Sequence, residues 1–406
     1  MLQKYAQLIV DVGINLQAGQ ILVINSPLAA APLARAVAAA AYKRGAYDVI
    51  VSWHDEEFTK LRYDCAGDAA LSEFPAWRHA FYMGYAERGA AVVSLVGDDP
   101  DLLRKTEPHK IMLVQKANGE GLLEYRARLM ANKNAWTIAP YATAPWAKKI
   151  FPSLSETEAV DRLWQEIYRA VRITPADDPI AAWQQHTDFL RRAADFMNGH
   201  AFKSLHYQNS LGTDLTLKLP DGHIWAGGAE YTENHTRFVA NMPTEEIYTL
   251  PCRNGAEGTV YATKPLNYQG KLIKDFRLVF HSGKVTDFSA STGEDTLREL
   301  IAADEGASYL GEVALVPYNS PISQSGILFY NTLFDENASC HLALGKAYPT
   351  CLKDGENMDS VELARHEVND SLIHVDFMIG SPDLSIVGTT ADGRTVKVFE
   401  SGNFAF

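Results

Sequence analysis

The chain has 406 residues, 47% of them hydrophobic and 21% charged, a composition typical of a soluble globular protein long enough for two domains. Its formal net charge of −13 argues against nucleic acid as a partner, because phosphate binding needs a basic surface. No apolar stretch approaches the ~20 residues that span a bilayer, so we expect no membrane partner.

The N-terminal part of the chain alternates between helical and strand patterns. Residues 2–16 have the apolar spacing of a helix, and this stretch lacks the basic segment, apolar core and cleavage site of a signal peptide. A second helix is predicted over 30–45, where Gly45 ends it. The strands predicted here are 18–27, 46–53, 89–97 and 109–116. This order implies right-handed crossovers and a mainly parallel sheet.

Two long helices follow this alternating region. The first, 155–173, has Ser155 or Thr157 as its cap and acidic residues in its first turn. The second, 180–199, ends at Gly199 and is expected to link two domains. The sequence therefore predicts an α/β N-terminal domain over residues 1–198.

After residue 200, short strands and turn residues dominate. The stretches 203–225 and 276–291 read as strands with hairpins at the sequences PDG and HSG, and the last residues, 393–406, are strand-like. One helix, 293–306, interrupts them. We expect an α+β, mostly antiparallel domain over residues 199–406. The four cysteines are scattered without CxxC spacing, which favours reduced thiols and a cytoplasmic protein.

The stretch SLIHVDFMIG, residues 371–380, reads as a buried strand that contains two polar residues. His374 and Asp376 are two positions apart, so both project from the same face of a strand. Burying an ionised carboxylate beside an imidazole costs several kcal/mol unless another group pairs with them. The sequence therefore predicts further polar partners opposite this strand.

Three other segments place polar residues among apolar or conformationally constrained neighbours. Glu312 stands at the start of the apolar strand 313–316. Glu245 and Glu246 lie between two prolines, and a strand would point only one of them inward. The third segment is a small-residue loop that contains Gly and carries Glu336, His341 and Tyr348. Taken singly, such residues are more often ion-paired glutamates or hydrogen-bonded core histidines.

As a set, these residues have the chemistry of a divalent metal site. No GxGxxG, P-loop or GxSxG motif occurs, and HEVND at 366–370 lacks the second histidine of a zincin helix. Two adjacent ions need about two imidazoles and several carboxylates, one of which bridges them. Glu246, Glu312, Glu336 and Asp376 provide the carboxylates, and His341 and His374 the nitrogens. With no thiolate present, a pair of Zn²⁺, Co²⁺, Mn²⁺ or Mg²⁺ ions is favoured over a cysteine-rich structural zinc.

Four of these segments, in this order and spacing, resemble one family of peptidases. The motifs MPTEEIYT, LGEVALVP, NTLFDENASCHLALGKAYP and HVDFMIGS are similar to those of the thermophilic metallo-aminopeptidases, which include aminopeptidases T, S and PepS. The opening pattern of residues 5–20 is similar as well, so that the resemblance covers essentially the whole chain.

The resemblance implies a two-metal exopeptidase that removes N-terminal residues from short peptides. It implies that the family's metal ligands are matched by Glu246, Glu312, His341, His374 and Asp376. Glu312 would be the bridge, Glu336 would be a further ligand or the group that handles protons, and Tyr348 would be a catalytic or metal-binding residue. The family characteristically forms dimers, so a homodimer is expected.

Two alternatives remain open from the residues themselves. Another two-metal amidohydrolase or phosphoesterase would need the same ligands, but a phosphoesterase should also place Arg or Lys at the phosphate. Only Lys346 and Arg365 lie near the ligand motifs, which weakly disfavours it. A non-enzymatic peptide-binding protein with a structural metal would hold one ion in a closed site.

Overall fold

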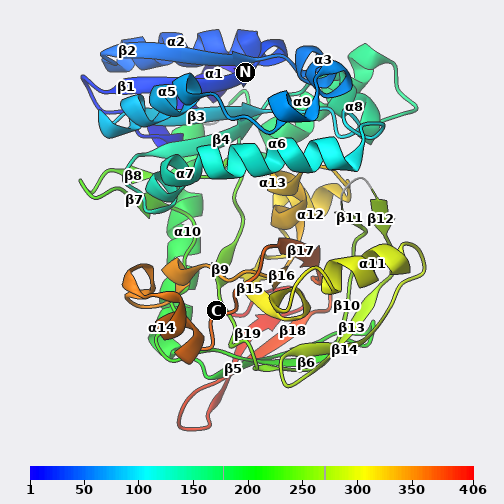
Figure 1. Cartoon of the computed structure of the whole chain (residues 1–406). Coiled ribbons are helices and arrows are strands. Elements are labelled where there is room, and N and C mark those ends of the chain that lie inside the picture. Colours follow the sequence, from blue (N-terminus) through cyan, green and yellow to red (C-terminus); the bar gives the residue numbers. More distant parts are fainter. Residues whose placement is uncertain (177, 269–270) are drawn as a thin grey trace. The chain divides into compact units, whose positions relative to one another are not determined.

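The structure is a computed structural model that describes residues 1–176, 178–268 and 271–406 (Figure 1). It contains two compact units, one of residues 1–185 with 229–243 and the other of residues 186–228 with 244–406. The chain therefore returns briefly to the first unit after entering the second. The domain bounds expected from the sequence, 1–198 and 199–406, stay a prediction. In the described residues, no helix has both the length and the hydropathy to cross a membrane.

The first unit is built on a four-stranded parallel sheet with the order β2-β1-β3-β4. Its strands are β1 (Ile21–Pro27), β2 (Asp48–His54), β3 (Ala91–Val96) and β4 (Trp136–Pro140), with a short hairpin of β7 (Glu230–Tyr231) and β8 (Arg237–Phe238). Its helices are α1 (Leu2–Leu8), α2 (Ala31–Arg44), α3 (Glu56–Cys65), α4 (Asp68–Leu71), α5 (Ala76–Glu87), α6 (Pro108–Gly121), α7 (Leu123–Met130), α8 (Ala144–Ile150) and α9 (Glu156–Ala170). The predicted parallel sheet is confirmed.

Local sequence signals explain where these helices begin and end. Gly45 follows α2 in the left-handed conformation, with φ of 97°, which glycine adopts without a steric penalty. At the start of α9, Ser155 accepts a hydrogen bond from the Glu158 N–H, and the Glu158 side chain accepts one from the Ser155 N–H. Of the two caps that the sequence offered, Ser155 is therefore the one present, and it forms a reciprocal capping box with Glu158.

The strand predicted over 109–116 is wrong, because these residues form the middle of α6. A short apolar run does not by itself distinguish a strand from a buried helical segment. Pro108 in the first turn favours a helix start. Val114 and Ala117 are buried three positions apart while Met112 is exposed, which is the pattern of one buried helix face.

The second unit contains antiparallel sheets, as expected. The larger has eight strands in the order β14-β13-β10-β6-β5-β18-β19-β20, and a second sheet has the order β17-β16-β15-β9. The large sheet consists of β5 (Ser204–Gln208), β6 (Asp214–Lys218), β10 (Ala256–Tyr261), β13 (Arg277–His281), β14 (Lys284–Ser289), β18 (Ser385–Thr389), β19 (Thr395–Glu400) and β20 (Asn403–Phe404). The other strands are β9 (Ile247–Thr249), β11 (Leu266–Tyr268), β12 (Lys271–Ile273), β15 (Leu310–Leu315), β16 (His341–Gly345) and β17 (His374–Met378).

Few helices accompany these sheets. They are α11 (Glu294–Ile301), α12 (Pro321–Ser325), α13 (Thr332–Asp335) and α14 (Ser360–Arg365), while α10 (Pro179–His200) runs from the first unit into the second. The hairpin at the sequence HSG is confirmed between β13 and β14. The one predicted at PDG is wrong: β6 ends before it and pairs with β5 across residues 209–213, where Asn209 accepts two backbone hydrogen bonds.

Candidate metal centre

Four of the predicted site residues, Glu312, His341, His374 and Asp376, lie on one face of the four-stranded sheet of the second unit. In an antiparallel pair, residues directly opposite each other share a face. Ala343 of β16 lies opposite both Glu312 of β15 and Asp376 of β17. By the same pairing, His341 is opposite Ala314, and His374 is opposite Gly345. The polar side chains therefore converge over alanine and glycine, which leave room between them.

Two of these side chains are placed differently from the sequence prediction. His341 is the first residue of the fully buried strand β16 instead of a loop residue. Glu312 lies within β15, at an irregularity in register between Leu310 and Glu312, and not before the strand. The intervening residue has to be small, because a Cβ on Gly311 would lie 2.3 Å from the carbonyl oxygen of Gly345. Such a bulge changes the direction in which a side chain points.

Glu312 stands between the two histidines. Its Oε1 is 3.8 Å from His341 Nε2, and its Oε2 is 3.1 Å from His374 Nε2. Two groups of possible ligand atoms result, Glu246–Glu312–His341 and Glu312–His374–Asp376, each with its donor atoms within 4.8 Å of one another. Glu312 belongs to both groups, so that one carboxylate faces two positions where a cation can be held.

Backbone carbonyls fix the orientation of both imidazoles. His341 Nδ1 lies 3.1 Å from the carbonyl oxygen of Ser339, and His374 Nδ1 lies 2.7 Å from that of Lys346. A proton on Nδ1 donates to each carbonyl, which directs Nε2 toward the carboxylates. This is the usual arrangement behind a histidine that binds a metal ion through Nε2.

Two buried oxygens at the site lack a hydrogen bond within the described residues. They are Glu246 Oε2, 3.3 Å from His341 Nε2, and Asp376 Oδ1, 3.3 Å from His374 Nε2. Buried carboxylate oxygens are costly unless a hydrogen-bond donor or a cation satisfies them. Together with two imidazole nitrogens, these oxygens form a donor set suited to borderline divalent cations.

The protonation states of the site follow from burial and from its crowded charges. Burial alone lowers the pKa of His341 and His374, but the neighbouring carboxylates outweigh it and raise these pKa values to about 10 and about 11. Burial raises the pKa of Glu246 to about 7. For Glu312, the imidazole hydrogen bonds outweigh burial and lower the pKa to about 2. At neutral pH, protons therefore balance the carboxylates of the metal-free chain.

Metal binding should release protons at pH 7. Both histidine pKa values lie above their usual 6.5, so both imidazoles are protonated in the metal-free chain and must lose a proton to bind a cation. Burial raises the pKa of Glu246 to about 7, so this carboxyl is a further source of released protons. We expect about two to three protons per chain, measured by calorimetric titration with Zn²⁺ in buffers of different ionisation enthalpy. Apparent affinity should rise with pH; release of less than one proton would contradict this assignment.

Glu336 and Tyr348 lie close to the two groups without belonging to either. Burial and the charges of Glu246 and Asp376 raise the pKa of Glu336 well above its usual value. The Tyr348 ring centroid is 4.7 Å from that of His374, and burial and nearby carboxylates, Glu312 first among them, raise its pKa. Both side chains therefore hold a proton near the site when the metal is absent.

The side chains of Glu245 and Glu246 have different surroundings, His186 for the first and His341 for the second. Glu245 is 2% exposed, and its Oε2 lies 3.8 Å from His186 Nε2 of α10. Its backbone N–H donates to Asn337 Oδ1 at 2.7 Å, which ties the segment before β9 to the segment that carries Glu336. Sequence reasoning missed His186 and the two carbonyls of Ser339 and Lys346, because neither the pairing register nor the packing of α10 has a local signature.

Comparisons with known proteins cover the whole chain. The family described as "Thermophilic metalloprotease (M29)" matches residues 1–404. Over 405 residues, the chain is 49% identical to "Aminopeptidase 2" of Geobacillus stearothermophilus and 47% identical to "Aminopeptidase AmpS" of Bacillus subtilis, covering 100% of this chain and 98% of each relative. The solved structure "Wild-type AmpT from Thermus thermophilus" superposes with a TM-score of 0.93 at 37% identity, covering 100% of this chain and 99% of that one.

Proposed function

The chain belongs to the thermophilic metalloprotease family M29 and is a metal-dependent aminopeptidase, and we propose that it uses two divalent cations to remove N-terminal residues from short peptides. The proposed ligands are Glu246, Glu312, His341, His374 and Asp376, with Glu312 as the bridge. The observation that carries the proposal is that the two oxygens of Glu312 face different imidazoles, each with its own second carboxylate.

The donor set fits such a pair. Three carboxylates offset most of the charge of two divalent cations, and the two orphaned oxygens of Glu246 and Asp376 would gain partners. When bound, the cations supply electrophilic polarisation of the scissile carbonyl and lower the pKa of a water molecule toward neutrality. This chemistry leaves the protein to orient the peptide, to move protons and to stabilise developing charge.

We assign proton transfer to Glu336. Its carboxylate feels the charges of Glu246 and Asp376 but belongs to neither group of ligand atoms, so it remains available to a proton. Its raised pKa reflects burial and neighbouring carboxylates, and added positive charge would lower that pKa toward the working pH. A carboxylate of this kind accepts the proton of the attacking water and delivers it to the leaving amine.

Tyr348 is assigned to the oxyanion. Its raised pKa keeps the hydroxyl protonated at neutral pH, and its ring packs beside His374. A preorganised hydroxyl donor aimed at the developing oxyanion contributes a few kcal/mol to catalysis. Carboxylates of the site can also receive the free α-amine of the peptide, which restricts cleavage to the terminal residue.

Replacing Glu336 with glutamine should separate proton transfer from metal binding. We expect kcat for an amino-acid p-nitroanilide to fall by about 10²- to 10⁴-fold, because the amide can neither accept nor deliver the proton. Metal content by elemental analysis should stay at that of the wild type. Loss of one ion in the variant would instead make Glu336 a ligand.

The ions are proposed to be Zn²⁺, Co²⁺, Mn²⁺ or Mg²⁺, because carboxylate oxygens and imidazole nitrogens suit all four. A dipeptide panel assayed with each ion after chelation tests the function and ranks the metals; hydrolysis of N-acetylated peptides at equal rates would contradict an aminopeptidase. We further propose a cytoplasmic homodimer. The four scattered cysteines, which lack CxxC spacing, support the location, and the family resemblance supports the dimer.

A further inference from the structure

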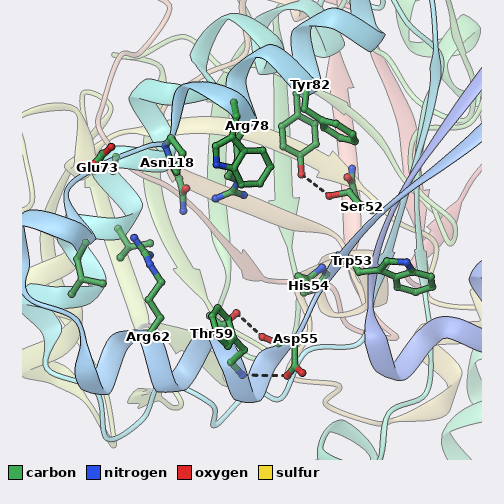
Figure 2. A pocket seen from close by; sticks show the side chains of 18 of the residues that line it. Ser52, Trp53, His54, Asp55, Thr59, Arg62, Glu73, Arg78, Tyr82 and Asn118 are labelled. Atoms are coloured by element: carbon green, nitrogen blue, oxygen red, sulfur yellow. Dashed lines mark hydrogen bonds between the residues drawn. The ribbon is translucent and has the colours of Figure 1, made fainter.

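The first unit contains a large pocket that holds none of the proposed metal-site residues (Figure 2). Its volume is about 830 Å³, which is within the usual range for small-molecule sites. The pocket lies at the carboxyl ends of β1 and β2, where Asn25 and His54 line it, and α3, α5 and α6 supply its other walls. The strand residues of the lining come from β1 and from β2, which is the edge strand of the sheet.

Aromatic side chains form much of the pocket's lining. Trp77 is 70% exposed, Phe58 is 66% exposed and Trp53 is 43% exposed, and all three line the pocket. Large aromatic residues on a surface are costly to keep in contact with water, and when gathered around a concavity they mark a binding site. The pocket therefore suits a ligand with a flat or large apolar group.

Two arginines give the pocket a positive centre. Figure 2 shows Arg62 and Arg78 extending into it from opposite walls, from α3 and α5. Arg62 donates one hydrogen bond to the carbonyl of Ala70, and the Arg78 guanidinium stacks over Phe74 at 5.1 Å. In the described part of the chain, no carboxylate lies within ion-pairing distance of either guanidinium. Several of their N–H donors therefore remain for an anionic ligand.

The acidic residues of the lining do not neutralise the positive charges of Arg62 and Arg78. Asp55 is occupied as the cap of α3, where its carboxylate accepts from the N–H groups of Glu57 and Phe58. Glu73 is exposed. Two features disfavour a nucleotide phosphate as the ligand. Residues 25–32, which join the end of β1 to the start of α2, contain no glycine, and Pro32 removes an N–H donor from the first turn of α2.

We propose that this pocket is a second ligand site, which binds peptides by their C-terminal carboxylate on Arg62 and Arg78 and by an aromatic side chain against the exposed rings. Guanidinium groups bind carboxylates with paired, charge-assisted hydrogen bonds, and indole faces stack on aromatic groups. The choice of a peptide rests on the aminopeptidase function; the pocket itself is independent of the metals. Peptide substrates and products both carry this carboxylate.

Calorimetric titration of the EDTA-treated full chain tests the proposal. The probe is N-acetyl-Ala-Phe, whose blocked amine removes it as an aminopeptidase substrate, and the comparison ligand is its C-terminal amide. We expect the carboxylate to bind at least about tenfold more tightly than the amide. The double variant R62Q/R78Q should lose about tenfold in affinity for the carboxylate and little for the amide. R78Q alone keeps the test valid if the double variant fails to fold, because the contact found for the Arg78 side chain in the described residues is its stacking on Phe74, and the substitution leaves the backbone hydrogen bonds of α5 in place.

Two controls separate charge from shape. E73Q removes a charge of the opposite sign from the same lining and should keep or tighten carboxylate binding, whereas W77A should weaken both probes. Equal affinities for acid and amide, or equal losses in E73Q and R62Q/R78Q, would overturn the proposal. The proposal would also be overturned if neither probe binds and W77A changes the oligomeric state measured by light scattering. The exposed aromatic rings would then form a contact between two copies of the chain. Because the chain is metal-free, failure of the two-metal proposal would leave these results unchanged.

Discussion

Replacing Glu312 with glutamine should lower hydrolysis of an amino-acid p-nitroanilide by at least about 10³-fold, as expected for the loss of several kcal/mol of catalytic stabilisation. An amide cannot carry the negative charge that one carboxylate here presents to two cation positions. In the proposed site both positions would lose a ligand at once, whereas a change at Glu246 or Asp376 would affect only one. Elemental analysis should show less than two bound ions per chain.

Glu245→Gln provides the matched control for this variant. Glu245 is as deeply buried as Glu312 and adjoins the proposed ligand Glu246, yet its carboxylate faces His186. We expect the control to keep the metal content of the wild type. Unchanged metal stoichiometry in Glu312→Gln would exclude Glu312 as the bridge, and equal metal loss in both variants would indicate general damage to the sheet.

Chelation with EDTA should abolish activity, and addition of Zn²⁺, Co²⁺, Mn²⁺ or Mg²⁺ should restore it. The protein should stay folded during this cycle, because the protonated imidazoles of His341 and His374 offset the carboxylate charge once the cations leave. Far-UV circular dichroism should therefore change little while hydrolysis disappears. The measurement pairs the p-nitroanilide assay with elemental analysis before and after chelation.

The two-metal proposal also sets the stoichiometry of recovery. Activity plotted against added cation should saturate at about two equivalents per chain. Saturation at one equivalent would indicate a single-ion site. Full activity in a sample free of metal would contradict a metal-dependent mechanism.

The sequence predicted the kind of fold well where local patterns were unambiguous. Alternating strand and helix patterns led to the parallel sheet, and Gly45 and Ser155 marked helix ends that the structure has. The run 109–116 was misjudged because four consecutive apolar residues suit a strand and a helix alike. The hairpin at PDG was misplaced because turn residues also occur in loops that do not join paired strands.

The candidate site residues could be chosen from the sequence by residue type, whereas their spatial arrangement depends on how the strands pair. His374 and Asp376 were predicted to share a face, and they do. That Glu312 lies between both imidazoles depends on the register of β15 with β16 and on the bulge at Gly311, which are long-range features. The pocket with Arg62 and Arg78 went unpredicted because the residues that line it come from several separate elements without a shared motif.

The hydrogen bonds that hold the two histidines have a consequence for exchange of the ions. Both bonds end on main-chain carbonyls, of Ser339 and Lys346, which belong to the chain whatever side chains those positions carry. Loss of a cation would break neither hydrogen bond, so the imidazole rings of His341 and His374 would keep their orientation in the metal-free chain. Binding of a new cation would then require loss of a proton from each imidazole but no refolding of the metal centre. Zinc fingers differ in this respect, because they unfold without their ion. If the proposed ligands are right, different divalent ions would meet the same imidazole orientations.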